Sequence, residues 1–248
     1  MAAGRSLRAV WQNQRGGLTY EIDREPTRVF VKWAPPEHGV DLDAELERLR
    51  WAAAYVSVPE VLDHGSDDEG AWIATRALPG TNAATEAWRR RPADAVAGLG
   101  RALRELHDRL PVAACPFSWS TETRVAELHR RADAGGFDGL EWDRGRLSLD
   151  PAAAIRLVDD APPVDVLVVC HGDACAPNTL LADDGLCTGH VDLGALGIAD
   201  RWADLAVASW SCDWNYGPGW QDTMFDAYGV RPDPLRIRYY RVLWDLGP

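Results

Sequence analysis

The pattern of apolar residues changes at Leu78–Gly80, and this change restricts the chain to folds with a strand-rich first part and a helical second part. Before it, LTYEI (Leu18 to Ile22) and RVFVKW (Arg28 to Trp33) are rich in β-branched and aromatic residues, which is typical of strands. SVPEVLDHG and GAWIATRA favour two further strands around the turn GSDDEG. An apolar stripe predicts one helix among these strands, from about residue 41 to 54.

After Gly80 the helical period dominates. A helix is expected to open at or just after Pro92, and further helices are expected at TRVAELHRRA, PAAAIRLV, ADLAVASW, WQDTMFDAY and PLRIRYYRVLW. VDVLVVCHGD reads as a short buried strand that ends in a polar turn. We therefore predict an α+β protein with two lobes: a small β-rich N-terminal lobe (1–77) and a larger helical C-terminal lobe (78–248), with a ligand between them.

The charge of the chain limits its partners. The net charge of the 248 residues is -12 and the pI is about 4.9, which disfavours nucleic acid and suits a cationic small molecule. The five cysteines include no Cys-x-x-Cys pair, as expected for a reduced, cytoplasmic protein. The N-terminus lacks the apolar run of a signal peptide, and no stretch approaches the roughly 18 apolar residues of a membrane span.

The segment from Val169 to Gly194, VCHGDACAPNTLLADDGLCTGHVDLG, contains His-x-Asp twice. One interpretation is a histidine–carboxylate metal hydrolase. The other is a phosphoryl-transfer site, because a kinase catalytic loop has the form His-x-Asp, four residues, Asn, followed later by Asp-x-Gly. Asp173, Asn178 and Asp192 fit that spacing. In this second interpretation His171 orders the loop and binds no metal.

The N-terminal part offers an independent argument for phosphoryl transfer. Lys32 is the only lysine of the chain and lies inside the apolar strand VFVKW. Glu45 falls beside the inward face of the predicted helix and Glu47 on its outer side, so Lys32 and Glu45 match the strand-lysine and helix-glutamate pair of kinases. A metal hydrolase requires neither residue. Gly16 and Gly17 form either a phosphate-covering loop or a simple hairpin turn.

Six segments together resemble the aminoglycoside phosphotransferases, most closely the 3′-phosphotransferase group: VFVKW, ALPG, CPF, VVCHGDACAPN, GHVDLGALGIADRWADLA and YYRVLWDL. The resemblance covers nearly the whole chain. It implies a protein-kinase-like fold, ATP or GTP with Mg²⁺, and a hydroxyl of an aminoglycoside antibiotic as acceptor, so that the enzyme confers resistance.

The resemblance also implies a role for individual residues. Asp173 is the expected catalytic base, Asn178 and Asp192 are the expected Mg²⁺ ligands, and Lys32, held by Glu45, is expected at the α/β-phosphates. Thr75 and Ala77 are the expected hinge residues that meet the nucleobase. Acidic side chains are expected to bind the cationic acceptor, and the matching positions are Glu141, Asp213 and Asp245.

Two features depart from the family pattern and leave the acceptor open. Ala195 stands where the family commonly has Arg, and Trp244 replaces the first of two C-terminal acids, with Gly247-Pro248 at the end. Alternatives are therefore a kinase of another amino sugar or small alcohol, an inactive nucleotide-binding protein, or the metal hydrolase. Several tryptophans near the expected acceptor side are interpreted as core, with stacking on a sugar ring as the alternative: Trp210, Trp214 and Trp220.

Overall fold

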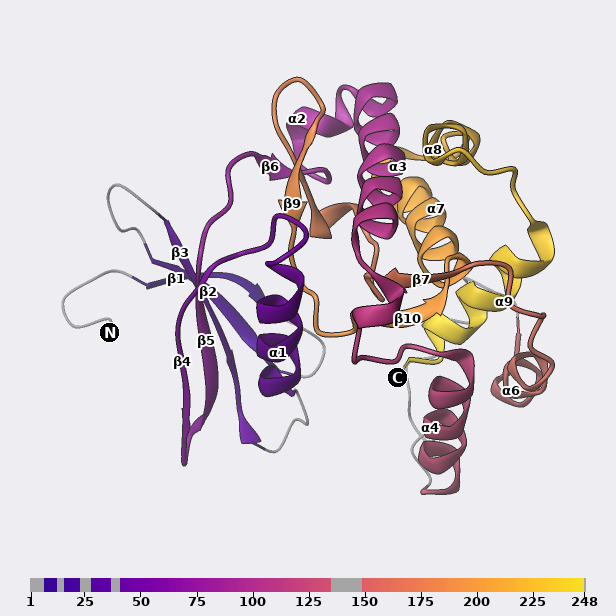
Figure 1. The fold of residues 1–248 in the computed structure, drawn as a ribbon, viewed down its shortest axis with the longest axis horizontal. Coiled ribbons are helices and arrows are strands. Elements are labelled where there is room, and N and C mark those ends of the chain that lie inside the picture. Colours follow the sequence, from indigo (N-terminus) through magenta and orange to yellow (C-terminus); the bar gives the residue numbers. More distant parts are fainter. Residues whose placement is uncertain (1–6, 13–15, 23–27, 37–40, 135–148, 248) are drawn as a thin grey trace.

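The computed structural model describes residues 7–12, 16–22, 28–36, 41–134 and 149–247. A β-sheet formed by the first part of the chain stands beside a larger body of helices formed by the rest (Figure 1). This arrangement agrees with the two-lobed α+β fold that the change of pattern at Leu78–Gly80 predicts.

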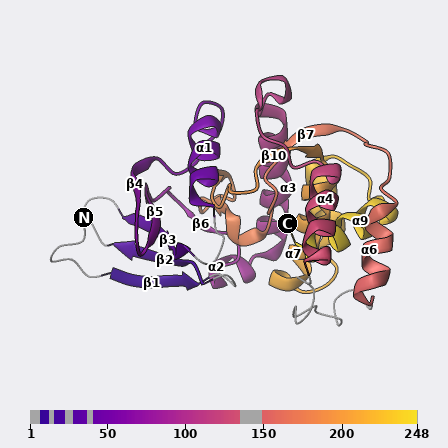
Figure 2. The ribbon, with the colours of Figure 1, turned by 90° about the horizontal axis from the view of Figure 1, so that it is seen from below.

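The N-terminal lobe is one antiparallel sheet with a single helix. Its strands lie in the order β1-β2-β3-β5-β4. They comprise β1 (Leu7–Gln12), β2 (Leu18–Ile22), β3 (Val29–Ala34), β4 (Val61–Asp67) and β5 (Gly70–Arg76). Helix α1 (Leu42–Ala52) begins after Asp41, whose side chain accepts a hydrogen bond from the Ala44 N–H. The apolar stripe of α1 packs on the sheet, and α1 lies between the sheet and the helical lobe (Figure 2).

The C-terminal lobe is built around helix α7 (Trp202–Tyr216). The residues from Trp202 to Cys212 are all buried, and a helix that is buried on every side forms the centre of a core. The surrounding helices include α3 (Pro92–Arg109), α8 (Gln221–Tyr228) and α9 (Pro234–Asp245), with α2 (Glu86–Arg89), α4 (Thr121–Asp133) and α6 (Pro151–Asp159) further out. None of the helices in the described ranges is long and apolar enough to cross a membrane.

Short strands in the C-terminal lobe carry the motif residues. Strand β7 (Leu167–Cys170) pairs with β10 (Gly197–Asp200), and β8 (Thr179–Leu181) pairs with β6 (Thr81–Asn82) and β9 (Cys187–His190). The two short helices η2 (Val112–Ala114) and η3 (Ala176–Asn178) complete the lobe. Strand β7 leads into His171 and β9 leads into Asp192, and the N–H of Val191 donates to the carbonyl oxygen of Asn178 at 3.0 Å, so the two motif loops lie side by side.

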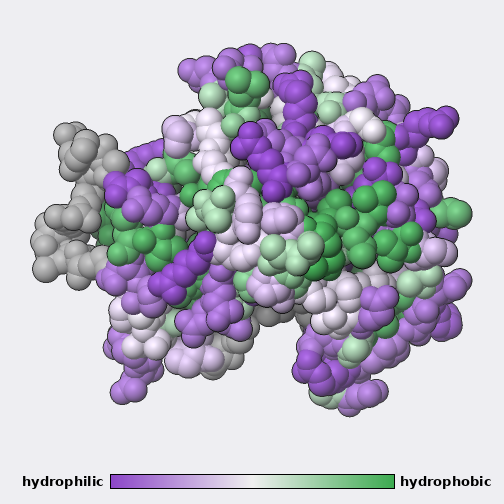
Figure 3. All heavy atoms as spheres, viewed as in Figure 1, coloured by the Kyte–Doolittle hydropathy of each residue, from purple (hydrophilic) through white to green (hydrophobic). Residues whose placement is uncertain are grey.

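The sequence pattern did not predict β1, nor the short strands β6, β8 and β10 of the C-terminal lobe. All six residues of β1 are exposed, and β1 pairs only with β2 at the edge of the sheet. Figure 3 shows hydrophobic residues on this part of the surface and over β7, where Val164, Val166 and Leu167 are exposed. The other predicted strands and helices are found, with ends that differ by a few residues.

Candidate active site

Lys32 forms ion pairs with residues of both lobes. Its ammonium group on β3 lies 2.6 Å from Oε1 of Glu45 on α1 and also forms an ion pair with Asp192 of the C-terminal lobe. Burial acts to lower the pKa of Lys32, but the charges of Glu45 and Asp192 outweigh it and raise the pKa above its ordinary value. The side chain therefore carries a fixed positive charge at the junction of the lobes.

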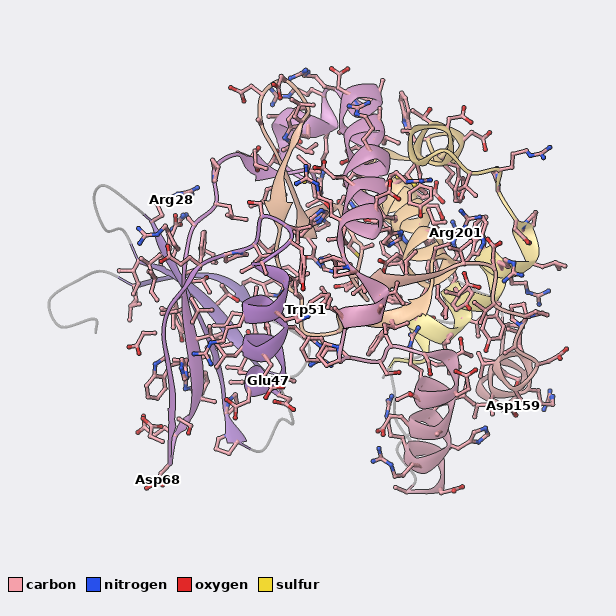
Figure 4. All side chains as sticks on the ribbon, viewed as in Figure 1. Arg28, Glu47, Trp51, Asp68, Asp159 and Arg201 are labelled. Carbon is pink, nitrogen blue, oxygen red and sulfur yellow. The ribbon has the colours of Figure 1, made fainter. Side chains whose placement is uncertain are left out.

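Of the two glutamates on α1 named above, the structure places Glu45, the expected partner, beside Lys32. Glu45 is buried on the inward face of α1, whereas Glu47 is exposed on the outer face (Figure 4). Helix α1 is itself anchored to the C-terminal lobe: Arg48 Nε donates to the carbonyl oxygen of Leu196 at 2.9 Å. Trp51 Nε1 likewise donates to the carbonyl oxygen of Ala114 at 3.2 Å, and its indole points toward the helical lobe in Figure 4.

Asp173 is held from two sides by residues of its own loop. Asn178 Nδ2 donates to Oδ2 of Asp173 at 3.0 Å and to its backbone carbonyl at 2.9 Å. The thiol of Cys175 donates to Oδ1 at 3.0 Å. Burial, followed by the Asp173 carboxylate, raises the pKa of Cys175 well above its ordinary value, so the thiol remains a protonated donor. The carboxylate is thus oriented before any acceptor arrives.

The two motif histidines serve the loop and are not arranged as metal ligands. His171 Nδ1 accepts from the N–H of Asp173 at 3.3 Å, and Nε2 donates to the carbonyl oxygen of Val191 at 3.0 Å. Both ring nitrogens are therefore engaged, and the ring ties the first motif loop to the second. Burial, with the neighbouring His171, lowers the pKa of His190 to about 3. These hydrogen bonds support the ordering role of His171 and argue against the metal-hydrolase interpretation, which needs a free nitrogen on that ring.

Beneath the loop lies a buried carboxylate that sequence reasoning missed. Asp204 on α7 accepts hydrogen bonds from the N–H groups of His171, at 2.6 Å, and Gly172, at 2.9 Å. His107 Nε2 lies 3.0 Å from the same carboxylate, and Tyr228 Oη lies 2.8 Å from His107 Nδ1. Burial acts to raise the pKa of Asp204, but the hydrogen bond from His107 and nearby charges lower it. The signal was present, because Asp204 belongs to the motif ADRWADLA.

The loop also requires a glycine at its turn. Gly172 has a φ of 86°, and a Cβ atom there would overlap the carbonyl oxygen and Cβ of Ala195. Ala195, which stands where the family commonly has Arg, therefore packs directly on the turn that precedes Asp173. In the second motif loop Asp192 has a φ of 65°, in the left-handed region, where Asp is among the few non-glycine residues commonly found.

The donor set fits a magnesium ion. Asn178 uses its amide nitrogen on Asp173, which directs its carbonyl oxygen away from that bond, and Asp192 offers carboxylate oxygens. Oxygen ligands of this kind suit Mg²⁺ rather than zinc. Burial acts to raise the pKa of Asp192, but the Lys32 charge outweighs it and lowers the pKa. Asp192 is thus an anion at neutral pH.

The predicted nucleotide residues lie around the inner face of the sheet. Gly16, with a φ of 78°, and Gly17 lie in the connection between β1 and β2. Thr75 pairs with Phe30 in the middle of the sheet. The N–H of Ala77 donates to the carbonyl oxygen of Arg28 at 2.9 Å, so a base at the hinge must replace that bond or use carbonyl oxygens. The hinge role of Thr75 and Ala77 stays a prediction.

Of the three acids predicted to bind the acceptor, Asp213 and Asp245 are partly buried in the structure. Oδ1 of Asp213 and Oδ2 of Asp245 are buried, and Oδ2 of Asp213 accepts a hydrogen bond from Gln221 Nε2 at 2.5 Å. Glu141 lies outside the described residues. Of the tryptophans, Trp210 is buried, as the core interpretation expects, but Trp214 is 40% exposed. The acceptor roles of the three acids stay predictions.

A five-stranded antiparallel sheet that carries a lysine–glutamate pair, set against a helical lobe that carries the Asp173 loop, defines a two-lobed kinase-like phosphotransferase. The model of the phosphotransferase enzyme family matches residues 11–240, and the chain belongs to this family.

Named relatives agree with this assignment. The chain is 36% identical to an aminoglycoside 3′-phosphotransferase of Streptomyces fradiae, over 95% of this chain and 92% of that protein. It is also 36% identical to a streptomycin 3″-kinase of Streptomyces griseus, over 94% of this chain and 89% of the other.

Solved structures agree as well. A crystal structure of an aminoglycoside 3′-phosphotransferase of type VIII is 30% identical and superposes with a TM-score of 0.85, covering 98% of this chain and 94% of that one. An aminoglycoside phosphotransferase of Streptomyces rimosus, in complex with ADP and streptomycin, is 26% identical with a TM-score of 0.76, covering 99% and 93%. The family and the fold expected from the motifs are therefore confirmed.

Proposed function

We propose that the chain transfers the γ-phosphoryl group of ATP or GTP to a hydroxyl of an aminoglycoside, of the 3′ type, and so inactivates the antibiotic. The observation that carries the proposal is the Lys32 ammonium held between Glu45 and Asp192. This contact brings a cation of the N-terminal lobe and an anion of the C-terminal lobe to one point. Nucleotide phosphates and their magnesium ion carry the complementary charges for that point.

The reaction follows from the position of Asp173. The acceptor oxygen forms a bond to the γ-phosphorus, the bond from that phosphorus to the bridging oxygen breaks, and the nucleoside diphosphate leaves. The proton of the acceptor hydroxyl passes to the Asp173 carboxylate, whose orientation Asn178 and Cys175 fix. Lys32 binds the α/β-phosphates and compensates their negative charge. The lobes themselves are proposed to divide at residues 77 and 78, with nucleotide on 1–77 and acceptor on 78–248.

Magnesium has a place in this proposal. Asn178 and Asp192 would hold it, and when bound it would neutralise phosphate charge. Activity should disappear when divalent cations are chelated and return with Mg²⁺. Activity restored by zinc alone would contradict the assignment of Asn178 and Asp192.

The names of the relatives support an aminoglycoside as acceptor and ATP as donor. The test couples ADP and GDP release to kanamycin, neomycin, streptomycin and simple amino sugars. We expect turnover of kanamycin or neomycin, a phosphate on the 3′-oxygen by NMR of the product, and no turnover of 3′-deoxy analogues. Turnover of simple amino sugars alone would replace the antibiotic by the alternative acceptor class. The absence of any ADP or GDP release would favour an inactive nucleotide-binding protein.

A further inference from the structure

We propose that the outer face of the N-terminal sheet carries a second ligand site, which binds a small organic cation with an apolar body. The site is a cavity of about 400 Å³ on the face of the sheet opposite Lys32. Aliphatic residues line it together with three aromatic side chains and two carboxylates: Tyr20, Trp33, Trp72, Asp67 and Glu69. The inference does not depend on phosphoryl transfer, because these residues lie outside the candidate active site.

The register of the strands places the cavity. Side chains alternate between the two faces of a strand, so Trp33 points away from the face of its neighbour Lys32 on β3. Lys32 forms an ion pair with Glu45 on α1, so its face is the one that α1 covers. Trp33 pairs with Trp72 on β5, and Tyr20 lies two positions along β2 from the residue opposite Trp33. The three aromatic residues therefore share the face that is turned away from α1.

Two glycines make room for the indoles. A Cβ atom at Gly65 on β4 would lie 2.5 Å from Cζ2 of Trp72, so the indole of Trp72 covers that glycine. A Cβ atom at Gly70, the first residue of β5, would lie 2.8 Å from Nε1 of Trp33. A side chain at either position would displace an indole. Both tryptophans are nevertheless only half-buried, so their rings lie close against the sheet and keep part of their surface open to the cavity.

The two carboxylates lie at the turn between β4 and β5. Oδ1 of Asp67 accepts hydrogen bonds from the N–H of Glu69, at 2.9 Å, and from the N–H of Gly70, at 3.1 Å, which fixes the turn. Glu69 is exposed, and its carboxylate has no ion-pair partner among the residues that the structure describes. None of the residues that line the cavity is a lysine or an arginine. The cavity is therefore negatively charged at this end and aromatic along the sheet.

This combination selects the class of ligand. The faces of Trp and Tyr rings attract an ammonium group, and aromatic side chains bind quaternary ammonium ions in this way. The volume falls within the range of about 300–1,000 Å³ that is usual for small-molecule sites. An anion would meet the Asp67 and Glu69 carboxylates without compensation. A polyhydroxylated aminoglycoside would lose water from hydroxyl groups beside Ile22 and Val31, which offer no side-chain partner. An alkyl- or arylammonium ion avoids both costs.

The first experiment locates the site by NMR of the full chain with isotope-labelled tryptophan side chains. The probe is benzyltrimethylammonium, and the control ligand is its neutral analogue benzyldimethylcarbinol, which has nearly the same shape. The indole signals of Trp33 and Trp72 are those missing from Trp33→Phe and Trp72→Phe. We expect the probe to shift these two signals with a Kd on the order of 1 mM, and the carbinol to bind about tenfold more weakly.

Two matched pairs of variants test the contacts. Trp72→Ala should weaken binding of the probe about tenfold, whereas Trp11→Ala, at an exposed tryptophan outside the cavity, should leave the Kd within about twofold of wild type. Glu69→Gln should weaken binding about threefold, as expected for an exposed charge pair. Asp68→Asn removes the adjacent exposed charge, which does not line the cavity, and should have a clearly smaller effect.

The outcomes separate this site from the active site. Absence of shifts in both indole signals at about ten times the expected Kd would overturn the proposal. Equal affinities for the probe and the carbinol, or equal effects of Glu69→Gln and Asp68→Asn, would overturn the selection of a cation. Displacement of the probe by Mg²⁺–ADP with kanamycin would place it in the active site and overturn the proposal as well. Glu69→Gln changes only an exposed side chain, so it gives a result even if Trp72→Ala does not fold.

The proposed function is tested separately, by the turnover of kanamycin and neomycin. Failure of the cation to bind would leave that function intact. Absence of turnover, with the shifts of Trp33 and Trp72 observed, would leave the second site intact.

Discussion

The Nζ atom of Lys32 lies 2.6 Å from Oε1 of Glu45, and the same ammonium also contacts Asp192 in the other lobe. The ammonium group of Lys32 on β3 therefore contacts both helix α1 and the loop after β9, which is more than a hundred residues further along the chain. The separation of the lobes is therefore limited by an ion pair as well as by packing. Substitutions at this point should affect nucleotide binding before they affect folding.

Lys32→Ala should raise the ATP KM by about tenfold or more and lower kcat, because the phosphates lose their positive partner. Glu45→Gln should have a smaller effect in the same direction, since Lys32 then keeps only Asp192. Glu47→Gln is the control on the same helix, because Glu47 is exposed. Steady-state kinetics with varied ATP measure all three. Equal behaviour of the Glu45 and Glu47 variants would contradict the proposed pair.

Asp173→Ala should lower kcat at least about 100-fold while nucleotide binding persists. The reason is that the proposed mechanism assigns the acceptor hydroxyl to Asp173 and the nucleotide to Lys32 and magnesium. Calorimetric titration with ADP and Mg²⁺ should give a Kd within about threefold of wild type. Turnover within tenfold of wild type would disprove the role of Asp173 as base.

The sequence indicated those candidate site residues that lie close together along the chain or stand out from their surroundings. Asp173 and Asn178 lie five positions apart in one loop, and Lys32 stood out as a lone charge in an apolar strand. Asp204 was missed because its role appears only when α7 passes beneath a loop some thirty residues earlier in the chain. It stabilises backbone N–H groups, and no side-chain pattern near position 171 indicates such a partner.

The same distinction holds for the fold. Strands with β-branched and aromatic runs, such as Val29–Ala34, were found where the pattern placed them. Strand β1 is short and all its residues are exposed, so it is held by pairing with β2 rather than by burial, and that pairing is not visible in the sequence of LRAVWQ. The acceptor side was hardest to predict. Whether Trp214 packs inward or faces solvent depends on contacts between α7 and α9 that are remote in sequence.

Asp204→Asn should destabilise the protein by about 3 kcal/mol and lower kcat, because a buried carboxylate that serves two backbone N–H groups and His107 loses its charge. Urea denaturation measures the free energy of unfolding. Asp68→Asn is the matched control, since Asp68 is exposed at the tip of the β4–β5 turn (Figure 4). A change below about 0.5 kcal/mol for Asp204→Asn would show that the loop does not depend on this carboxylate.

Stability should fall on mild acidification because of His190. Its pKa is about 3 in the folded protein, against 6.5 ordinarily, chiefly because it is buried. Between these values the unfolded chain binds more protons, so the free energy of unfolding decreases as the pH falls, by about 1.4 kcal/mol per pH unit. The contribution of His190 is fully present above pH 6.5. Asp192 and Asp204, whose pKa values are lowered, lose theirs only near pH 4 and below.

The measurement is urea denaturation at about pH 7 and pH 5 for the wild type and for His190→Gln. The wild type should lose about 2 kcal/mol more than the variant over this interval, because only the wild type must keep an imidazole neutral at position 190. His64→Gln, at an exposed histidine, should behave like the wild type. Parallel losses in the wild type and His190→Gln would show that His190 is not the group responsible.

Trp244→Asp should change the way in which the acceptor is bound rather than abolish binding. The resemblance implies an acid at this position, and an added carboxylate would form a further charge pair with an ammonium group of the acceptor. Charge pairs open to solvent are screened over about 8–10 Å near physiological ionic strength, so each added pair increases the salt dependence of binding. The neomycin KM of Trp244→Asp should therefore rise more steeply than that of the wild type as NaCl increases. Trp244→Phe keeps an aromatic face and should retain the wild-type slope. Identical salt dependence in the wild type and Trp244→Asp would mean that position 244 does not contact the acceptor.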